Sequence, residues 1–157
     1  MTPASLRPAT ELDLESILEI ELKSFPNPWA LAQFSAELMV PYSRFFVLTD
    51  DETDEMILAY IIYRIQADGV SLLNLAVHPA WRGLKFAEKM MRAMIHETVR
   101  DEIPKIILEV RPSNRGAIRL YTELGFKLTH ERKNFYQNGE SALIMELKTS
   151  DLSGIIQ

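Results

Sequence analysis

A strand, a helix and a second strand follow one another between residues 70 and 110, and this order constrains the fold more than any other feature. Val70–Val77 and Lys105–Val110 are rich in β-branched and apolar residues, which is typical of strands. From Gly83 to about Arg100, residues of a buried face recur at helical spacing, namely Leu84, Ala87, Met91, Met94, Ile95 and Thr98. A helix that joins two strands of one sheet makes a parallel crossover. The order therefore predicts an α/β fold, which some classification schemes would call α+β.

Antiparallel hairpins are predicted on both sides of this crossover. Arg44–Thr49 and Met56–Ile65 are strand-like runs separated by the acidic turn Asp50–Glu55. The dipeptide Asp68-Gly69 is typical of a tight turn, because glycine accepts the positive φ of a type I′ turn. These features predict an antiparallel meander of three strands before the crossover helix. Asn138-Gly139 predicts another hairpin between the last two strands.

Capping residues, prolines and a glycine mark the ends of three further helices. Thr10 and Asp13 have capping-box spacing at the start of a helix that ends near Phe25, where two prolines follow. A short helix is predicted over 30–39, and another over 114–124 because a glycine follows its last turn. No repeat or flexible linker interrupts these elements, which indicates a single domain.

Length and hydrophobicity agree with one globular domain. The chain has 157 residues, of which 47% are hydrophobic and 25% are charged, and this balance excludes a disordered or fibrous chain. No apolar run approaches the ~20 residues of a membrane span, and the first residues lack a secretory core. We therefore expect a cytoplasmic protein without a membrane partner.

Charge and cysteine content exclude several function classes. The net charge of −5 argues against nucleic acid as a partner. The chain has no cysteine, so a disulfide, a cysteine-ligated zinc ion and a cysteine nucleophile are excluded. Its three histidines are scattered, without the spacing of metal ligands, and we expect no metal.

Two stretches carry candidate chemistry. In the junction Leu73–Ala87, a strand leads through a short loop to a helix N-terminus, where free N–H groups and the helix dipole favour phosphate. In Leu108–Phe126, strand alternation directs Glu109 away from the side of its apolar neighbours. Such a carboxylate either faces solvent, pairs with a nearby arginine (Arg111 or Arg132), or acts in a reaction. Tyr121 equally fits the apolar face of an ordinary helix.

Taken together, the two stretches resemble motifs A and B of the GNAT superfamily of acyl-CoA-dependent N-acetyltransferases. The pattern E-V-R-P-S-N-x-x-A-I-x-L-Y-x-x-x-G-F resembles motif B of the RimI-type ribosomal-protein alanine N-acetyltransferases. Phe25–Trp29 and Arg132–Leu147 also resemble that subfamily. The resemblance implies one domain over residues 1–147, with a mixed sheet of about six to seven strands and about four helices. We expect the tail 148–157 to be disordered.

The resemblance also implies a site for acetyl-CoA as cosubstrate and no metal. In such enzymes a strand end binds the pantetheine arm through its backbone, which here corresponds to Leu75, Ala76 and Val77. A loop cradles the pyrophosphate, which corresponds to Arg82, Gly83, Leu84, Lys85, Phe86 and Ala87. A motif B asparagine that contacts the cofactor corresponds to Asn114.

Three side chains acquire roles in the reaction from the same resemblance. Glu109 matches the general base of the RimI subfamily, and Tyr121 matches its general acid. Tyr136 matches tyrosines that line the groove for the acceptor peptide, although a tyrosine on a hairpin also packs on the surface without a role. The implied partner is a protein N-terminus with alanine or serine, and the acidic net charge would attract the basic tails of ribosomal proteins.

One position departs from the family pattern. Lys85 stands where motif A usually has glycine. Glycine matters if the loop needs a positive φ, whereas a lysine is tolerated if the position is already helical. Gly83, two positions earlier, relieves part of the constraint. We expect weaker cofactor binding but retained activity.

The amine chemistry favours an N-terminal acceptor. An α-amine has a pKa of about 7.7–8.0 against about 10.4 for lysine, so far more of it is neutral at pH 7. A glutamate acting through water suffices as its base. Without a cysteine, direct transfer in a ternary complex is expected. The alternatives are a GNAT enzyme that acetylates lysine, a polyamine or another small amine, and a non-catalytic acyl-CoA-binding regulatory module.

Overall fold

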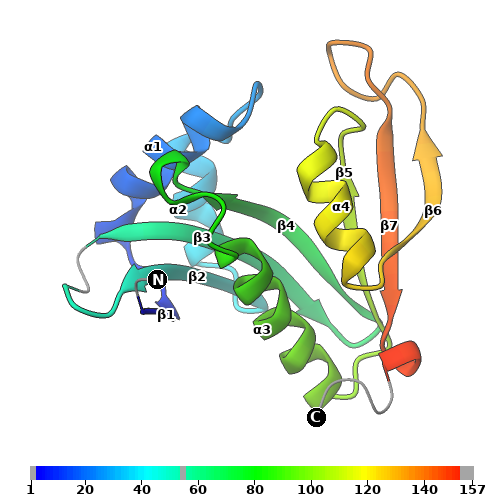
Figure 1. The fold of residues 1–157 in the computed structure, drawn as a ribbon, viewed down its shortest axis with the longest axis horizontal. Helices are drawn as coiled ribbons and strands as arrows, with labels where there is room; N and C mark the ends of the chain where they lie inside the picture. Colours follow the sequence, from blue (N-terminus) through cyan, green and yellow to red (C-terminus); the bar gives the residue numbers. More distant parts are fainter. Residues whose placement is uncertain (1–2, 54–55, 153–157) are drawn as a thin grey trace. The chain divides into compact units, whose positions relative to one another are not determined.

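The computed structural model of the protein describes residues 3–53 and 56–152 (Figure 1). Its strands are β1 (Ala4–Pro8), β2 (Ser43–Asp50), β3 (Ile57–Gln66), β4 (Gly69–Val77), β5 (Lys105–Val110), β6 (Lys127–Arg132) and β7 (Ala142–Lys148). Its α-helices are α1 (Leu14–Ser24), α2 (Leu31–Leu38), α3 (Phe86–Arg100) and α4 (Arg115–Glu123). The described residues thus form a seven-stranded sheet, in the order β1-β2-β3-β4-β5-β7-β6, and four α-helices. The expected α/β class and the expected strand and helix numbers are confirmed.

The chain divides into two compact units. The first comprises the residues up to Ile65 together with Asn74–Met94, and the second comprises Gln66–Leu73 and the residues from Ile95 onward. In the second unit β4 runs parallel to β5, with Val70 opposite Ile106, which confirms the predicted crossover. The pairs β1–β2, β2–β3, β5–β7 and β6–β7 are antiparallel.

The core of the first unit is built around β3. Its residues from Ile57 to Tyr63 are all buried, so both faces of this strand are covered. Phe34 of α2 is fully buried and its ring lies edge-on to that of Tyr60, 5.8 Å between centroids. The edge strand β1 was not predicted, because the run is only five residues long and ends at a proline, although its residues alternate between apolar and polar. Only its pairing with β2, which places Leu6 opposite Leu48, defines it.

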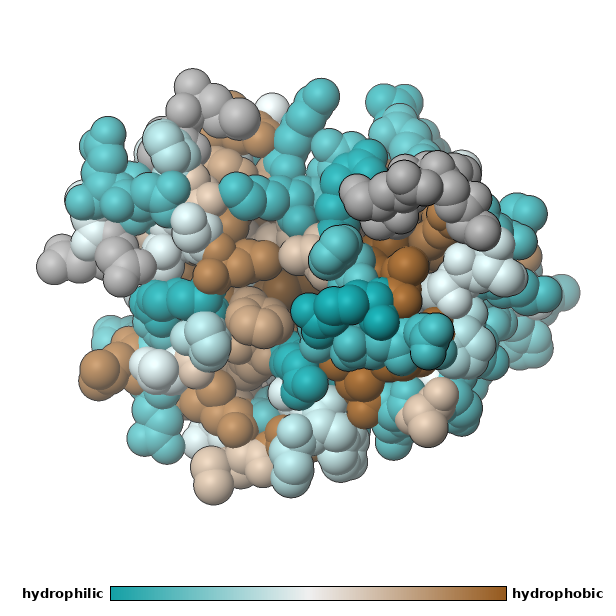
Figure 2. Space-filling view, turned by 90° about the horizontal axis from the view of Figure 1, so that it is seen from below, coloured by the Kyte–Doolittle hydropathy of each residue, from teal (hydrophilic) through white to brown (hydrophobic). Residues whose placement is uncertain are grey.

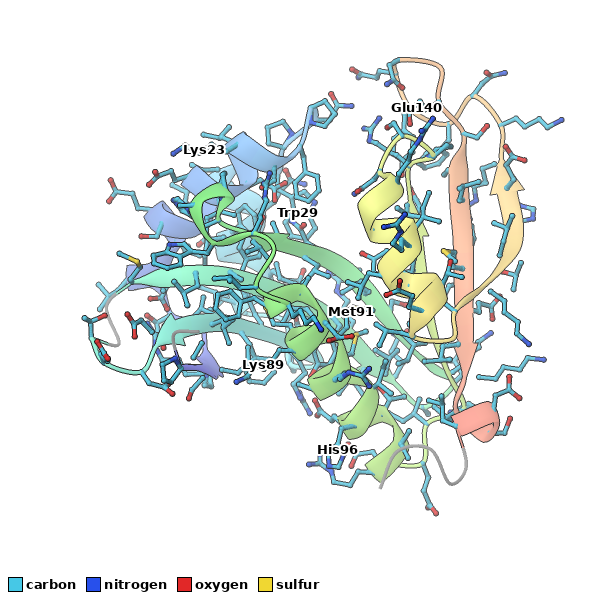
Figure 3. The ribbon with its side chains drawn as sticks, viewed as in Figure 1. Lys23, Trp29, Lys89, Met91, His96 and Glu140 are labelled. Carbon is cyan, nitrogen blue, oxygen red and sulfur yellow. The ribbon has the colours of Figure 1, made fainter. Side chains whose placement is uncertain are left out.

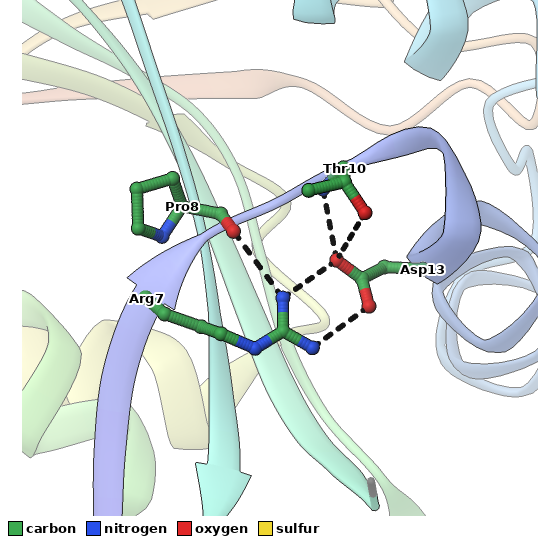
Figure 4. Close-up of polar contacts among 4 residues, drawn as sticks. All are labelled: Arg7, Pro8, Thr10 and Asp13. Atoms are coloured by element: carbon green, nitrogen blue, oxygen red, sulfur yellow. Dashed lines mark hydrogen bonds and ion pairs between the residues drawn. The ribbon is translucent and has the colours of Figure 1, made fainter. Parts of the chain in front are cut away.

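The start of α1 confirms the predicted capping box (Figure 4). The Thr10 N–H donates to Asp13 Oδ2 at 2.8 Å. Arg7, which the sequence pattern did not include, donates from both terminal nitrogens to the Asp13 carboxylate at 2.8 and 2.9 Å. These bonds from Arg7 hold the pKa of buried Asp13 below its usual value. The first turn, Glu11–Asp13, is a 3₁₀-helix that continues into α1.

Asp13→Asn is expected to destabilise the protein by about 2 kcal/mol at pH 7, the range for a charge-assisted hydrogen bond. Because the folded pKa of Asp13 is lowered, its contribution is complete above the unfolded value of about 3.9 and is lost as the pH falls through the folded value. Urea unfolding at pH 7 and at pH 3 to 4 measures both effects. The difference between wild type and variant should shrink in acid.

Glu19→Gln is the matched control, since Glu19 pairs with Lys23 at an exposed site on α1. Solvent screens this pair, and its loss should leave the free energy of unfolding nearly unchanged. An acid-independent difference between wild type and Asp13→Asn would contradict the role given to the carboxylate charge.

In the second unit, α4 has the predicted boundaries. The Asn114 side chain caps its start by accepting from the Ala117 N–H at 3.3 Å. At its end Gly125 has a φ of +104°, and the Phe126 N–H bonds to the Tyr121 carbonyl at 3.0 Å. This Schellman arrangement needs a residue that accepts a positive φ, which explains the glycine.

The C-terminal part differs from expectation in two places. The predicted turn at Asn138-Gly139 is present, with the Gly139 N–H donating to the Tyr136 carbonyl at 2.9 Å and Gly139 at a φ of +87°, but it lies within a nine-residue connection, 133–141, and the last two strands do not extend to it. Lys148 ends β7 and Thr149–Leu152 forms a 3₁₀-helix with Leu152 buried. The Thr149 hydroxyl donates to the Ile103 carbonyl at 2.8 Å, which orders this start of the expected tail. Residues 153–157 lie outside the described residues.

The surface mixes polar and apolar residues. Figure 2 shows hydrophilic residues over much of one face, with apolar residues between them. None of the helices within the described ranges is both long and apolar enough to cross a membrane.

Candidate active site

The end of β4 holds the three residues expected to bind the pantetheine arm. Ala76 is buried, whereas Leu75 and Val77 are half-buried. The Leu75 N–H donates to Asn74 Oδ1 at 2.9 Å, and the Val77 carbonyl accepts from Arg82 Nε at 3.1 Å. Arg82 also donates to Ser24 Oγ at 3.0 Å. The backbone of this segment is therefore held in place by side chains of the first unit.

The loop before α3 is not helical at Lys85, where the sequence allowed either a helical residue or a positive φ. Lys85 has a φ of +65° and Gly83 has a φ of +83°, and the helix begins only at Phe86. The Lys85 carbonyl accepts from the Lys89 N–H at 3.1 Å, so Lys85 directly precedes the first turn. The helical alternative for Lys85 is therefore wrong. A non-glycine residue in this conformation costs about 1–2 kcal/mol, which explains why glycine would suit the position.

The difference in stability between Lys85→Gly and Lys85→Ala is expected to have the opposite sign to that at an ordinary helix position. At a positive φ the glycine variant should be more stable than the alanine variant, by up to about 1 kcal/mol. Both variants lose the lysine charge, so their difference reports the backbone alone. Thermal or urea unfolding measures it.

Arg92, exposed within α3, provides the matched pair. There the glycine variant should be less stable than the alanine variant by about 1 kcal/mol. The same order at positions 85 and 92 would show that Lys85 carries no strain.

Glu109 and Tyr136 are brought together in the second unit. The Tyr136 hydroxyl donates to Glu109 Oε1 at 2.7 Å, and the Arg111 guanidinium lies over the Tyr136 ring, 3.7 Å from its centroid. Glu109 is on the exposed side of β5, as alternation predicted, but its hydrogen-bond partner is Tyr136 rather than the suggested arginines. Burial, followed by the bond to Glu109, raises the pKa of Tyr136. Its hydroxyl therefore remains a donor at neutral pH.

The connection that carries Tyr136 is tied to the start of α4. Glu140, labelled in Figure 3, accepts from the Ser113 hydroxyl at 3.0 Å. The Tyr136 N–H in turn donates to the Glu140 carbonyl at 3.0 Å. Ser113 directly precedes Asn114, the cap of α4. The segment that orients Tyr136 is therefore fixed to Ser113, the neighbour in sequence of the asparagine expected to contact the cofactor.

Tyr121 lies on the buried face of α4 with its ring 5.9 Å from that of Phe126. Burial raises its pKa to about 12. The core interpretation and the acid interpretation both fit this placement, since the side chain packs in the core and stays protonated at neutral pH. Relative to a thiol of pKa about 8.5, the proton transfer is uphill by about 5 kcal/mol, against about 2 kcal/mol for an ordinary tyrosine.

A buried carboxylate in the first unit was not among the residues predicted from the sequence. Glu21 of α1 is 1% exposed. Its Oε1 accepts from Asn74 Nδ2 at 2.8 Å and from the Tyr60 hydroxyl, and its Oε2 accepts from the Trp29 N–H at 2.8 Å. Burial and the adjacent carboxylate raise the pKa of Tyr60, so its hydroxyl stays a donor. The signal was present, because Glu21 follows Ile17 by four residues on the apolar face of the helix.

Residues 14–126 match the model of the acetyltransferase (GNAT) family. The chain belongs to this family. It is 34% identical to a Bacillus subtilis (strain 168) protein, provisionally named a ribosomal protein bS18-alanine N-acetyltransferase, over 92% of this chain and 95% of that protein. It is similar to the crystal structure of the ribosomal-protein-S18-alanine N-acetyltransferase from Escherichia coli, with a TM-score of 0.84, 28% identity and 94% of each chain covered.

A solved structure with lower sequence identity has the same fold. Arabidopsis thaliana NAA60 in complex with acetyl-CoA has a TM-score of 0.82 at 18% identity, over 94% of this chain and 99% of that one. Together with the mixed sheet and its crossover, these likenesses establish the GNAT fold and the acyltransferase class of this family member.

The first turn of α3 fits the diphosphate of an acyl-CoA. Its leading N–H groups have no partner within the helix, and the helix dipole favours an anion there. Arg82 and Lys85 add positive charge, and no atom lies within 4 Å of the position that a Cβ on Gly83 would occupy. Backbone donors, cations and open space together suit an anionic group. Among the described residues, no cluster of histidine, aspartate and glutamate could hold a metal ion.

Proposed function

We propose that this protein is an acetyl-CoA-dependent N-α-acetyltransferase that modifies the N-terminal alanine of ribosomal protein bS18. The names of the Bacillus relative and of the Escherichia coli structure describe this activity, and both match the chain almost throughout. The observation that carries the proposal is the exposed Glu109 carboxylate, oriented by Tyr136 at the end of β5. Ribosomal proteins are made in the cytoplasm, where this acceptor places the enzyme.

The base that the site offers suits an α-amine. At pH 7 about a tenth of an α-amine is neutral, whereas fewer than one lysine in a thousand is. The carboxylate therefore needs to remove a proton only as the amine attacks, and a glutamate is strong enough for this. A lysine or polyamine acceptor would require a stronger base, or would react slowly because so little of the amine is neutral at pH 7.

Glu109 is the general base in this proposal. Its Oε1 accepts from Tyr136, and its Oε2 receives the proton of the amine directly or through one water. The stacked Arg111 keeps the Tyr136 ring in place. Tyr136 thereby orients the carboxylate and lines the groove for the acceptor peptide.

Tyr121 is the general acid in this proposal. Its raised pKa keeps the proton on the hydroxyl until it is transferred to the sulfur of the leaving coenzyme. Direct transfer is favoured because the chain has no cysteine to carry an acetyl group.

Acetyl-CoA supplies an acetyl group activated as a thioester. The first turn of α3, with Arg82 and Lys85, would hold its diphosphate, and the backbone of Leu75–Val77 would align its pantetheine arm. Asn114 uses Oδ1 to cap α4, which leaves its Nδ2 for the cofactor.

Acetyl transfer to defined peptides tests the proposal. A peptide with the bS18 N-terminus should be acetylated on its first residue, as located by mass spectrometry, and a serine at position 1 tests the second expected residue. The same peptide with a blocked α-amine and a free lysine side chain should be inert. Transfer to the blocked peptide or to spermidine would favour a small-amine or lysine enzyme, and acetyl-CoA binding without any transfer would favour a regulatory module.

A further inference from the structure

Glu21 lies outside the residues assigned to the reaction, yet it joins two segments of the first unit. One oxygen holds Asn74 on β4, and the other holds the Trp29 N–H ahead of α2. Asn74 completes the connection because its Oδ1 accepts from the Leu75 N–H. A chain of hydrogen bonds thus runs from Trp29 through the carboxylate to the backbone proposed to align the cofactor.

The donors fix the direction of each hydrogen bond between Trp29 and Leu75. The Trp29 N–H can only donate, so the oxygen facing it must accept. The Asn74 amide must present Oδ1 to the Leu75 N–H, which leaves Nδ2 facing Glu21. A carboxylate, with acceptors on both oxygens, satisfies both neighbours at once. Tyr60 adds a third donor to the same group.

The burial of the carboxylate suggests a role beyond filling the core. Glu21 and Asn74 are 1% and 8% exposed, and a buried charge is stabilised only by such a complete set of donors. An apolar residue would fill the same space in α1 without these partners. The polar group therefore has the effect of fixing one orientation of the Asn74 amide, and with it the peptide group of Leu75.

We propose that Glu21 is a positioning residue for acetyl-CoA, acting through Asn74 on the backbone of Leu75. It touches no substrate, and it sets the orientation of the strand segment to which the pantetheine arm binds. This inference rests on the proposed function only in that Leu75 belongs to the cofactor site. The acceptor plays no part in it.

Glu21→Gln should weaken acetyl-CoA binding about tenfold, within the usual range of couplings between sites. The glutamine has one acceptor where two are needed. The Trp29 N–H can only donate and cannot rotate, so the glutamine oxygen faces it. The glutamine amide then faces Asn74, which must turn and leave the Leu75 N–H without an acceptor. Calorimetry with acetyl-CoA, on protein shown to be folded by circular dichroism, measures the dissociation constant without any acceptor.

The double variant Glu21→Gln with Asn74→Asp should restore the affinity to within threefold of wild type. The introduced aspartate accepts from Leu75 with one oxygen and from the glutamine amide with the other, while the glutamine oxygen accepts from Trp29. The Trp29 N–H, the glutamine amide and the Leu75 N–H then each have an acceptor, and the Tyr60 hydroxyl, which donated to Glu21, must turn to the introduced carboxylate at position 74. A residue with a merely space-filling role would show no such rescue.

Glu37→Gln is the matched control. Glu37 is another buried carboxylate of the first unit, 4% exposed, and it binds Arg64 through both oxygens at 2.7 and 2.9 Å. Its substitution removes a buried charge from α2 but leaves the Asn74 connection intact. Acetyl-CoA affinity should remain within twofold of wild type even if the melting temperature falls.

Asn74→Ala tests the same proposal if Glu21→Gln does not fold. It removes the connection while Glu21 retains Tyr60 and Trp29, and acetyl-CoA binding should again weaken about tenfold. Unchanged binding in either variant, an equal loss in Glu37→Gln, or no rescue in the double variant overturns the role of Glu21. A wild-type protein that binds no acetyl-CoA contradicts the proposed function instead.

Discussion

Glu109→Gln is expected to lower kcat by about 10²–10³-fold, the usual contribution of a general base. The glutamine side chain has the same size, and its oxygen can still accept from the Tyr136 hydroxyl. The local geometry is therefore preserved while the basic oxygen is lost. The dissociation constant for acetyl-CoA should stay within twofold, because the proposed role is proton transfer. Steady-state kinetics with an alanine peptide and calorimetry with acetyl-CoA measure the two quantities.

Glu123→Gln controls for the loss of one negative charge in the same unit. Glu123 is exposed at the end of α4 and has no proposed role. Its kcat should equal that of wild type. If Glu109→Gln keeps kcat within threefold at saturating substrates, Glu109 is not the base.

Tyr121→Phe is expected to lower kcat by about 10²-fold, because the leaving thiolate loses its proton donor. The ring stays buried against Phe126, so the fold should change little. The pH dependence adds a second readout. The hydroxyl acts in its protonated form, and burial raises its pKa to about 12. Wild-type kcat should therefore show no decrease from tyrosine ionisation between pH 8 and pH 10.

Tyr63→Phe is the matched control, since Tyr63 is also a buried tyrosine, on β3 of the first unit, and has no proposed role. It separates the loss of a buried hydroxyl from the loss of an acid. A fall in wild-type kcat centred near pH 10 that disappears in Tyr121→Phe would contradict the raised pKa. Equal kcat values for Tyr121→Phe and wild type would remove the tyrosine from the reaction.

The elements that the sequence predicted well are those with local causes. The crossover helix, the Asn114 cap and the Gly125 termination of α4 depend on residues within a few positions of one another. The capping box of Thr10 and Asp13 has the same origin. Hydrophobic periodicity and end signals act over short range, so they can be read along the chain.

The elements that were missed depend on distant partners. The strand β1 exists through its pairing with β2, more than thirty positions away, where Ala4 lies opposite Asp50. Thr149 is ordered by the carbonyl of Ile103. Arg7 is only six positions from Asp13, but it lies outside the spacing of a capping box, and the fold places its guanidinium beside the carboxylate. No periodicity reports such contacts, because the partner's position is set by the tertiary fold.

The features of the candidate site also fall into those that the sequence predicted and those that only the fold defines. The motifs alone singled out Glu109 and Tyr121 as reacting groups and marked Lys85 as a departure from the family. They could not show that Tyr136 binds Glu109, that burial raises the pKa of Tyr121, or that Lys85 has a positive φ. Nor could they show that the Glu21 carboxylate meets Asn74, which is 53 residues away.

By itself, then, the sequence determined the α/β order, the family resemblance and the residue types available for the chemistry, including the absence of cysteine. These follow from local periodicity, spacing and composition. The tertiary structure alone decided which oxygen each donor reaches, which tyrosine is desolvated and which backbone is strained. Hydrogen bonding and desolvation depend on distances between residues far apart in the chain, and only the folded protein defines those distances.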